Sequence, residues 1–292
     1  MKLNAECMEC MLRRHLKTAR AHGSEEQVTA FARDLMNLLA NGPEEAASPY
    51  YTPAISKLFT KHFGLAEDRF KEEKEDSNRF VLARLETIRA QVRGAADPLY
   101  AGIQMAILGN YIDFSALQGE VSFEKLDQMI ASAGEIEVDR EVYAQLRQDL
   151  SSARELLYLT DNAGEIGFDR VLAEQIHALY PEISITFCVR GGPAQNDATR
   201  EDAAVIGIPF PVIGNGSRIP GTVLSEASPE LRRAMASADV VLSKGQANVE
   251  TLLESRHESN LYYLFLIKCG RFIDHFGKPK FTPMLVRDNR KR

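Results

Sequence analysis

The feature that most constrains the fold is a change of pattern near residue 155. Before it, from Ala5 to about Ala153, apolar residues recur at helical spacing and turn signals are sparse. After it, short apolar runs alternate with segments of helical spacing. Strands separated by helices favour a parallel sheet covered by helices on both faces. The sequence therefore predicts an α/β protein with a helical domain at 1–150 and an α/β domain at 151–292.

The predicted elements have the lengths of ordinary buried strands and amphipathic helices. The predicted strands are Leu156–Thr160, Ser184–Val189, Phe210–Ile213, Val240–Ser243, Leu261–Ile267 and Met284–Val286. The helices predicted in the second half are Ile166–Leu179, Ala198–Ile206, Pro229–Ala236 and Val249–Glu254. In the first half, helices are predicted over Val28–Leu39, Ala54–Phe63 and Leu99–Leu108. The charge run at 71–76 is read as a solvated helix face.

Charge and hydropathy exclude several classes of protein. The net charge of -6 argues against a dedicated nucleic-acid binder, which would usually be basic. No apolar segment approaches the roughly 20 residues that cross a bilayer, and no secretory signal pattern begins the chain. Four cysteines without a disulfide framework suit a reducing compartment. We expect a soluble cytoplasmic protein without a membrane or nucleic-acid partner; the sequence does not reveal its oligomeric state.

Polar residues follow three of the predicted strands. The segments are Thr-Asp-Asn-Ala-Gly-Glu at 160–165, Arg-Gly-Gly-Pro-Ala-Gln-Asn-Asp at 190–197 and Ser-Lys-Gly-Gln-Ala-Asn at 243–248. In an open parallel sheet, ligands bind beyond the carboxyl ends of the strands. Helix capping or a turn explains each segment separately, but not why all three lie on one edge. We therefore favour one shared site.

The oxygen-bearing side chains of this edge suit a hard metal ion. Asp161, Asn162 and Asp197 offer carboxylate and amide oxygens, which are the ligands that Mg²⁺ or Mn²⁺ prefer. These residues are the predicted metal ligands.

Other groups at the same edge suit a phosphate. Lys244 offers a positive point charge, and Ala163-Gly164 and Gly245 leave backbone N–H groups at helix N-termini, where anions are favoured. Arg190 follows a strand, and a substrate contact and a surface role are equally compatible with that position. Metal, ammonium and N–H groups together fit charge that develops on phosphoryl oxygens.

Several motifs resemble those of the metal-dependent damage-control phosphatase family, long known only as a domain of unknown function. They are Asp-Asn-Ala-Gly-Glu at 161–165, Asn-Asp-Ala-Thr at 196–199 and Lys-Gly-Gln-x-Asn-x-Glu at 244–250. Cys-Met-Glu-Cys at 7–10 and the segments at 97–100 and 109–113 resemble the prokaryotic branch. The similarity follows the order of the chain over most of its length.

The resemblance implies a helical N-terminal domain packed on a Rossmann-like C-terminal domain with a mainly parallel sheet. It implies one divalent cation, Mn²⁺, Mg²⁺, Co²⁺ or Ni²⁺, held by Asp161, Asn162 and Asp197. Lys244 corresponds to the family's phosphate-contacting lysine, and Asn110 and Asp113 would lie across the cleft. The implied substrates are small phosphate monoesters such as sugar phosphates or related damaged metabolites. Ala247 departs from the family pattern, which more often has glycine.

Our hypothesis for the chemistry is attack by metal-activated water in line with the leaving alkoxide. Glu165 or Asp113 would carry the proton, and the sequence does not choose between them. A covalent route through a phosphorylated Asp161 is also open.

Two other functions remain as alternatives. Rossmann-like sheets also host nucleotide- or S-adenosylmethionine-binding transferases, but the chain has neither GxGxxG after its first strand nor a P-loop. A non-catalytic metal or redox module could use Cys7 and Cys10, with Cys269 as a third partner. Zinc needs about four ligands, and no second CxxC completes such a site. Cys188 is read as a core residue.

Overall fold

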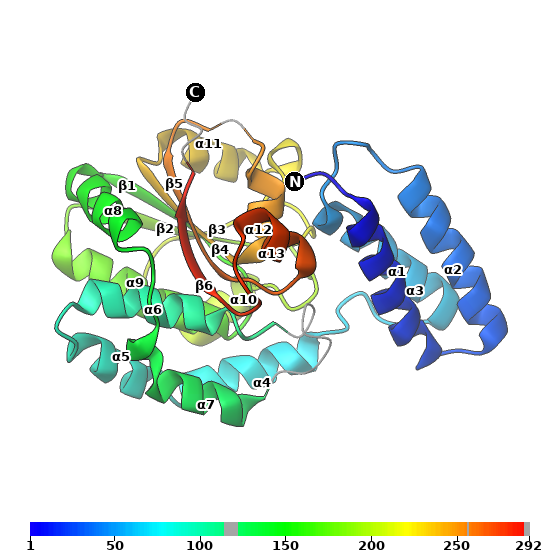
Figure 1. Ribbon diagram of the computed structural model, residues 1–292, viewed down its shortest axis with the longest axis horizontal. Coiled ribbons are helices and arrows are strands. Elements are labelled where there is room, and N and C mark those ends of the chain that lie inside the picture. Colours follow the sequence, from blue (N-terminus) through cyan, green and yellow to red (C-terminus); the bar gives the residue numbers. More distant parts are fainter. Residues whose placement is uncertain (114–121, 256, 289–292) are drawn as a thin grey trace.

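The computed structural model describes residues 1–113, 122–255 and 257–288 of the chain. Figure 1 shows a bundle of the first three helices beside a larger body built around a sheet. The helices are α1 (Ala5–Arg20), α2 (Glu25–Ala40), α3 (Thr52–Phe63), α4 (Lys71–Leu82), α5 (Leu85–Arg93), α6 (Pro98–Gly109), α7 (Phe123–Ala131), α8 (Arg140–Ser152), α9 (Glu165–Leu179), α10 (Arg200–Ile206), α11 (Pro229–Ser237), α12 (Gly245–Leu252) and α13 (Gly270–Phe276). The 3₁₀ turns are η1 (Ser48–Tyr51), η2 (Ala133–Glu135) and η3 (Leu224–Glu226).

The sheet has the order β3-β2-β1-β4-β5-β6. Its strands are β1 (Glu155–Leu159), β2 (Ser184–Val189), β3 (Val212–Gly214), β4 (Val240–Lys244), β5 (Asn260–Leu266) and β6 (Pro283–Arg287). The first five are parallel, and β6 runs antiparallel to β5. The predicted α/β class with a mainly parallel sheet is therefore confirmed. The strand order reverses between β1 and β4, which makes their carboxyl ends the topological switch point.

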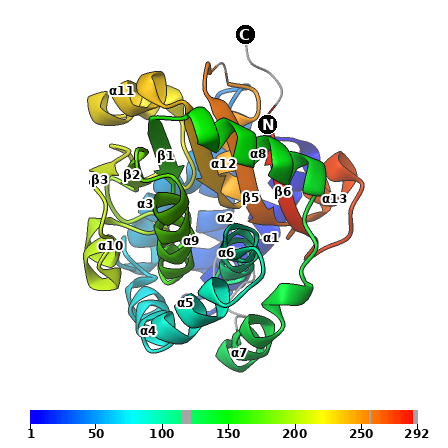
Figure 2. The ribbon, with the colours of Figure 1, turned by 90° about the vertical axis from the view of Figure 1, so that its left-hand side faces the viewer.

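Helices cover both faces of the sheet. Along β1, Leu156 and Tyr158 face one buried cluster, whereas Leu157 and Leu159 face the other, as the period of two in a strand requires. The first cluster includes side chains of α4–α10, and the second includes side chains of α11–α13. In Figure 2, α9 and α6 lie next to each other beside the sheet, with α4 and α5 outside them. The helices after β1 and β4 thus lie on opposite faces.

The bundle of α1–α3 has a separate core. Val28, Phe31, Leu35 and Phe59 belong to a buried cluster that shares no residue with the two clusters of the sheet. In contrast, Val81 of α4 belongs to the sheet cluster. The division at 1–150 and 151–292 stays a prediction, but the described cores separate the bundle from the rest at the connection around residues 64–70.

All the predicted strands and helices occur, and most of their ends shift by at most two residues. The exceptions are α2 and α12, which begin three and four residues before the predicted starts. One interpretation needs correction, because the charge run at 71–76 begins a helix that is partly buried. Lys74, Ser77 and Asn78 of α4 face the sheet body, and Lys74 forms a 2.9 Å ion pair with Asp202. A polar helix face can be buried when each polar group finds a partner.

None of the helices in the described ranges is long and apolar enough to span a membrane.

Candidate active site

The loops after β1 and β2 are joined by backbone hydrogen bonds. Asn162 and Asp197 form an isolated antiparallel bridge. The Ala198 N–H donates to the Asp161 carbonyl at 2.7 Å, and the Ala163 N–H donates to the Asn196 carbonyl at 2.9 Å. The bridge brings two of the predicted ligand positions side by side. It lies at the carboxyl ends of the strands, as the sequence predicted.

The Asp161 carboxylate is held from three directions. Its Oδ2 accepts hydrogen bonds from the side-chain amides of Asn110 and Asn162, each at 2.9 Å. On a third side lies Gly245, whose φ is +76° and where a Cβ would stand only 1.8 Å from that oxygen. Position 245 must therefore be glycine, both for its backbone conformation and for the space that Asp161 occupies. In this structure Gly245 makes room for the acid.

The Asp197 carboxylate is held by a buried arginine. Arg190 Nε donates to Asp197 Oδ2 at 2.6 Å, and its Nη2 donates to the Thr160 carbonyl at 2.9 Å. Arg190 is only 1% exposed, so the surface role considered from sequence does not apply to it. Its Nη1 is buried and has no acceptor within the described ranges. Arg190 thus ties the loop after β2 to the end of β1.

Burial makes these acids hard to ionise without a compensating cation. Burial raises the pKa of Asp161 well above its usual range, and the neighbouring Glu165 and Asp197 raise it further. Burial also raises the pKa of Asp197 to about 6, although Arg190 opposes the shift. A divalent cation would offset this concentration of negative charge.

The donor set fits a hard cation. The side-chain oxygens of Asp161, Asn162 and Asp197 are of the kind that Mg²⁺ and Mn²⁺ select. The neighbouring Asn196 Oδ1 is buried and has no hydrogen-bond donor among the described residues. Within the residues that the structure describes, no group of three His, Cys, Asp or Glu side chains is placed to hold a metal ion. A cation here would therefore use amide oxygens together with the carboxylates.

Lys244 does not offer its ammonium group to a ligand in this structure. Its Nζ donates to the Ala106 carbonyl at 2.7 Å, to Glu165 at 2.7 Å and to Asp169 at 2.6 Å, and the side chain is 0% exposed. Burial favours the neutral amine, but Asp169 and Glu165 outweigh it, and the pKa of Lys244 is raised. All three donors of the ammonium are used. The sequence predicted that Lys244 contacts a phosphate, but in this structure its ammonium group binds only groups of the protein.

Glu165 and Asn110 belong to the same internal network. Glu165 is fully buried and accepts from Lys244 Nζ, from the Asn110 amide at 3.1 Å and from the Asn162 amide at 2.6 Å. Asn110, at the end of α6, also accepts from the Leu266 N–H at 3.1 Å. The two side chains therefore fasten α6 and β5 to the acid cluster, which is formed by Asp161, Glu165 and Asp197. Neither Glu165 nor Asn110 is exposed to a substrate in this structure.

The backbone N–H groups predicted to bind phosphate are also hydrogen-bonded internally. The Ala163 N–H donates to Asn196, as described above, and the Gly164 N–H donates to Asn78 Oδ1 at 2.7 Å. Gly164 has a φ of +74°, and a Cβ there would lie 2.7 Å from Ser77 of α4. The Gly164 N–H is not available to a phosphate as predicted, because α4 packs directly on this loop.

A lysine that the sequence interpretation overlooked lies at the same edge. Lys268 follows β5, is 7% exposed and donates from Nζ to Asp113 Oδ2 at 2.7 Å. The charges of Lys268 and Asp113 both act on the pKa of Asp161, Lys268 lowering it and Asp113 raising it, so the pair lies near that acid. The sequence could have indicated this position, because Lys268 is the first charged residue after the predicted strand Leu261–Ile267.

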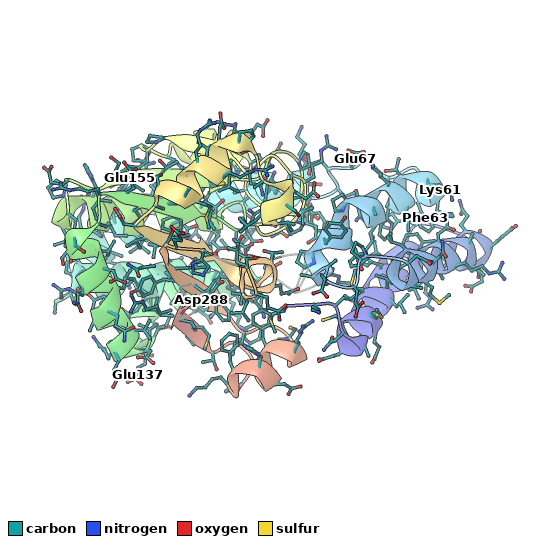
Figure 3. All side chains as sticks on the ribbon, turned by 90° about the horizontal axis from the view of Figure 1, so that it is seen from above. Lys61, Phe63, Glu67, Glu137, Glu155 and Asp288 are labelled. Atoms are coloured by element: carbon teal, nitrogen blue, oxygen red, sulfur yellow. The ribbon has the colours of Figure 1, made fainter. Side chains whose placement is uncertain are left out.

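The acid cluster faces the side of the body where the bundle lies. In Figure 3, Glu155, at the amino end of β1, lies far from the bundle, and Glu67 lies where the bundle meets the body. The carboxyl end of β1, with Asp161 just beyond it, is therefore turned toward the α1–α3 bundle.

The cysteines form no metal centre in the described structure. Cys7, Cys10, Cys188 and Cys269 are all free thiols. Cys7 Sγ lies 3.2 Å from Arg271 Nη1, and the charge of Cys7 acts on Cys269, so these two thiols are near each other. Cys188 is buried in β2, as expected, and burial raises the pKa of its thiol to about 12.

Fold and site together define an α/β protein with a buried acidic site at the switch point of its sheet. The model of the damage-control phosphatase ARMT1-like domain matches residues 3–282, and the chain belongs to this family. Membership supports a phosphatase activity and confirms the resemblance seen in the motifs.

The relatives are similar over the full chain. Damage-control phosphatase PH1575 of Pyrococcus horikoshii is 29% identical over 295 residues, covering 100% of both proteins. An uncharacterized protein of Methanocaldococcus jannaschii is 31% identical over 286 residues, covering 95% of this chain and 92% of that protein. The crystal structure of a DUF89 family protein from P. horikoshii matches with a TM-score of 0.82 and 28% identity, covering 99% of this chain and 100% of that one.

Proposed function

We propose that this protein hydrolyses small phosphate monoesters, such as sugar phosphates or related damaged metabolites, with one divalent cation held by Asp161, Asn162 and Asp197. The observation that carries the proposal is the bridge between Asn162 and Asp197, which gathers buried acids at the switch point. Family membership supports the phosphatase class. Mn²⁺, Mg²⁺, Co²⁺ and Ni²⁺ are the candidate ions.

A bound cation would polarise the phosphoryl group and lower the pKa of a coordinated water. The chain supplies the positioning. Asn110 and Asn162 orient Asp161, and Arg190 orients Asp197 through a charge-assisted hydrogen bond. Rigid placement of such groups accounts for much of the acceleration of phosphoryl transfer.

We assign to Lys268 the phosphate contact that the sequence predicted for Lys244. For the proton transfer, which the sequence left open between Glu165 and Asp113, we favour Asp113. The Lys268 ammonium, paired with Asp113 beside the acid cluster, is our candidate for contacting the phosphate oxygens. Asp113, whose side chain is 14% exposed, is better placed than the fully buried Glu165 to exchange a proton with a substrate.

The test is a chelator-stripped assay on a panel of phosphate esters, with each divalent metal added back. Turnover should depend on the metal, and Asp161→Asn and Asp197→Asn should each lower kcat/KM by at least about 100-fold, because each removes a ligand charge. Cys7→Ser is the matched control and should stay within about twofold of the wild type. The opposite ordering would support the cysteine-based module instead.

A rapid acid quench with ³²P-labelled substrate separates the two chemical routes. Direct attack by water leaves no label on the protein, whereas a route through Asp161 would leave an acid-stable phosphoprotein that Asp161→Asn abolishes.

A further inference from the structure

A pocket lies between the α1–α3 bundle and the loop after β2. Its empty volume is about 470 Å³, including space open to solvent. Its walls come from the start of α3, from the connection to α4, from the loop after β2 and from the loop after β3. Its lining includes the polar side chains Lys57, Glu67, Arg69, Gln195 and Arg218.

The pocket shares two loops with the acid cluster. Gln195 lines it and is separated from Asp197 by one residue. Arg218 lines it from the loop whose Gly221 backbone lowers the pKa of Asp197. A substrate whose phosphate lay at the acid cluster could therefore extend its other end into this pocket.

The pocket is positively charged in a chain whose net charge is -6. Its lining has three basic side chains, Lys57, Arg69 and Arg218, and one acidic side chain, Glu67. Glu67 is already ion-paired with Arg218. The first turn of α3 also lines the pocket through Thr52 and Pro53.

Arg69 lacks the acidic partner that a half-buried guanidinium usually has. It stacks on the Phe59 ring at 4.0 Å, and no acidic side chain in the described ranges forms an ion pair with it. Burial lowers the pKa of Arg69, and the like charge of Arg14 lowers it further. A guanidinium fixed against an aromatic ring and left with open donors is suited to bidentate binding of a carboxylate or phosphate.

We propose that this pocket binds an anionic group, a carboxylate or a second phosphate, at the end of the substrate remote from the scissile phosphate. The proposal rests on the proposed function and names its substrate class: phosphate monoesters with a negative charge at the far end. Arg69 is the principal anion-binding group, and Lys57 adds to its attraction.

The test compares 6-phosphogluconate with glucose 6-phosphate, which have six-carbon chains but differ in the charge at the far end. The wild type should prefer 6-phosphogluconate in kcat/KM, and Arg69→Gln should reduce that preference about tenfold, the cost of losing one charge-assisted hydrogen bond. Lys57→Glu, on the exposed side of the pocket, should reduce it in the same direction. Arg33→Gln, an exposed arginine of α2, is the matched control and should leave the preference unchanged.

Binding of the same two compounds, measured by titration calorimetry, keeps this test separate from the test of catalysis. If neither compound is hydrolysed with any metal but the wild type binds 6-phosphogluconate more tightly and Arg69→Gln does not, the pocket is supported and the phosphatase proposal fails. Equal binding of the two compounds, including no binding of either, overturns the pocket proposal. An equal loss of preference in Arg33→Gln also overturns it.

Discussion

At the scale of single residues, the structure shows how many internal partners each charged side chain at a strand end has. Lys244 ends β4 and Lys268 follows β5 at the same edge of the sheet, so their sequence positions look equivalent. Lys244 is surrounded by three acceptors within the protein, whereas Lys268 has one carboxylate partner, Asp113. A strand end predicts the edge on which a side chain lies but not how many internal partners it meets.

Lys244→Met should therefore act mainly on stability. It would leave Glu165 and Asp169 buried without their cation, and losing one partner of such a cluster typically costs about 3–5 kcal/mol. Urea denaturation of the metal-free protein measures the change. The exposed Lys278→Met is the control and should change the free energy of unfolding by less than about 0.5 kcal/mol. Unchanged stability with lost turnover would instead restore Lys244 as a phosphate contact.

Glu250 gives a pH-dependent prediction. Burial raises the pKa of Glu250 to about 7 despite Arg271, and its Oε2 has no partner within the described ranges. A carboxyl with a raised pKa in the fold costs stability as pH rises from its unfolded value, near 4.5, to about 7. Glu250→Gln removes that cost, so its free energy of unfolding relative to the wild type should rise by up to roughly 3 kcal/mol between pH 5 and pH 8. Denaturation midpoints at the two values check this; parallel pH profiles for the two proteins would contradict it.

At the scale of elements, α4 supports the candidate site through contacts that the sequence did not predict. Asn78 donates to Asp202 at 2.8 Å and accepts from the Gly164 N–H, so it joins α4 both to α10 and to the loop after β1. Asn78→Ala would leave a buried N–H and a buried carboxylate oxygen without partners, at a cost of about 2–4 kcal/mol.

The Asn78 prediction has a local readout. Hydrogen exchange at the Gly164 amide should accelerate in Asn78→Ala more than exchange in the α1–α3 bundle, which has its own core. Asn37→Ala, on the exposed face of α2, should change neither the exchange rate of the Gly164 amide nor that of the bundle amides. A uniform acceleration across the chain would show that Asn78 acts on global stability alone.

The sequence sufficed for the six strands and for the edge where the five parallel strands end, with Asp161 and Asp197 just beyond it, because these depend on local patterns that recur along each element. It did not suffice for the use of backbone N–H groups. Gly164 is paired with Asn78, 86 positions earlier, and no local pattern connects the two. Arg190 was likewise left open, since its burial depends on the return of the chain at Asp197.

At the scale of the whole molecule, the separate cores predict how a metal changes thermal unfolding. A cation bound at Asp161 and Asp197 stabilises only the body that contains the sheet clusters, by about 3 kcal/mol at 100 times its Kd. Calorimetry with and without Mn²⁺ should show the sheet body's transition move upward by several degrees, while the bundle's transition stays in place. A single transition would show that bundle and body unfold together, and an unmoved profile would argue against the metal site.

The bridge between the loops after β1 and β2 also ties the proposed metal site to the order of folding. A chain in which β2 has not yet paired with β1 lacks the bridge that brings Asn162 and Asp197 together. The proposed hydrolysis would therefore begin only after those two strands have paired.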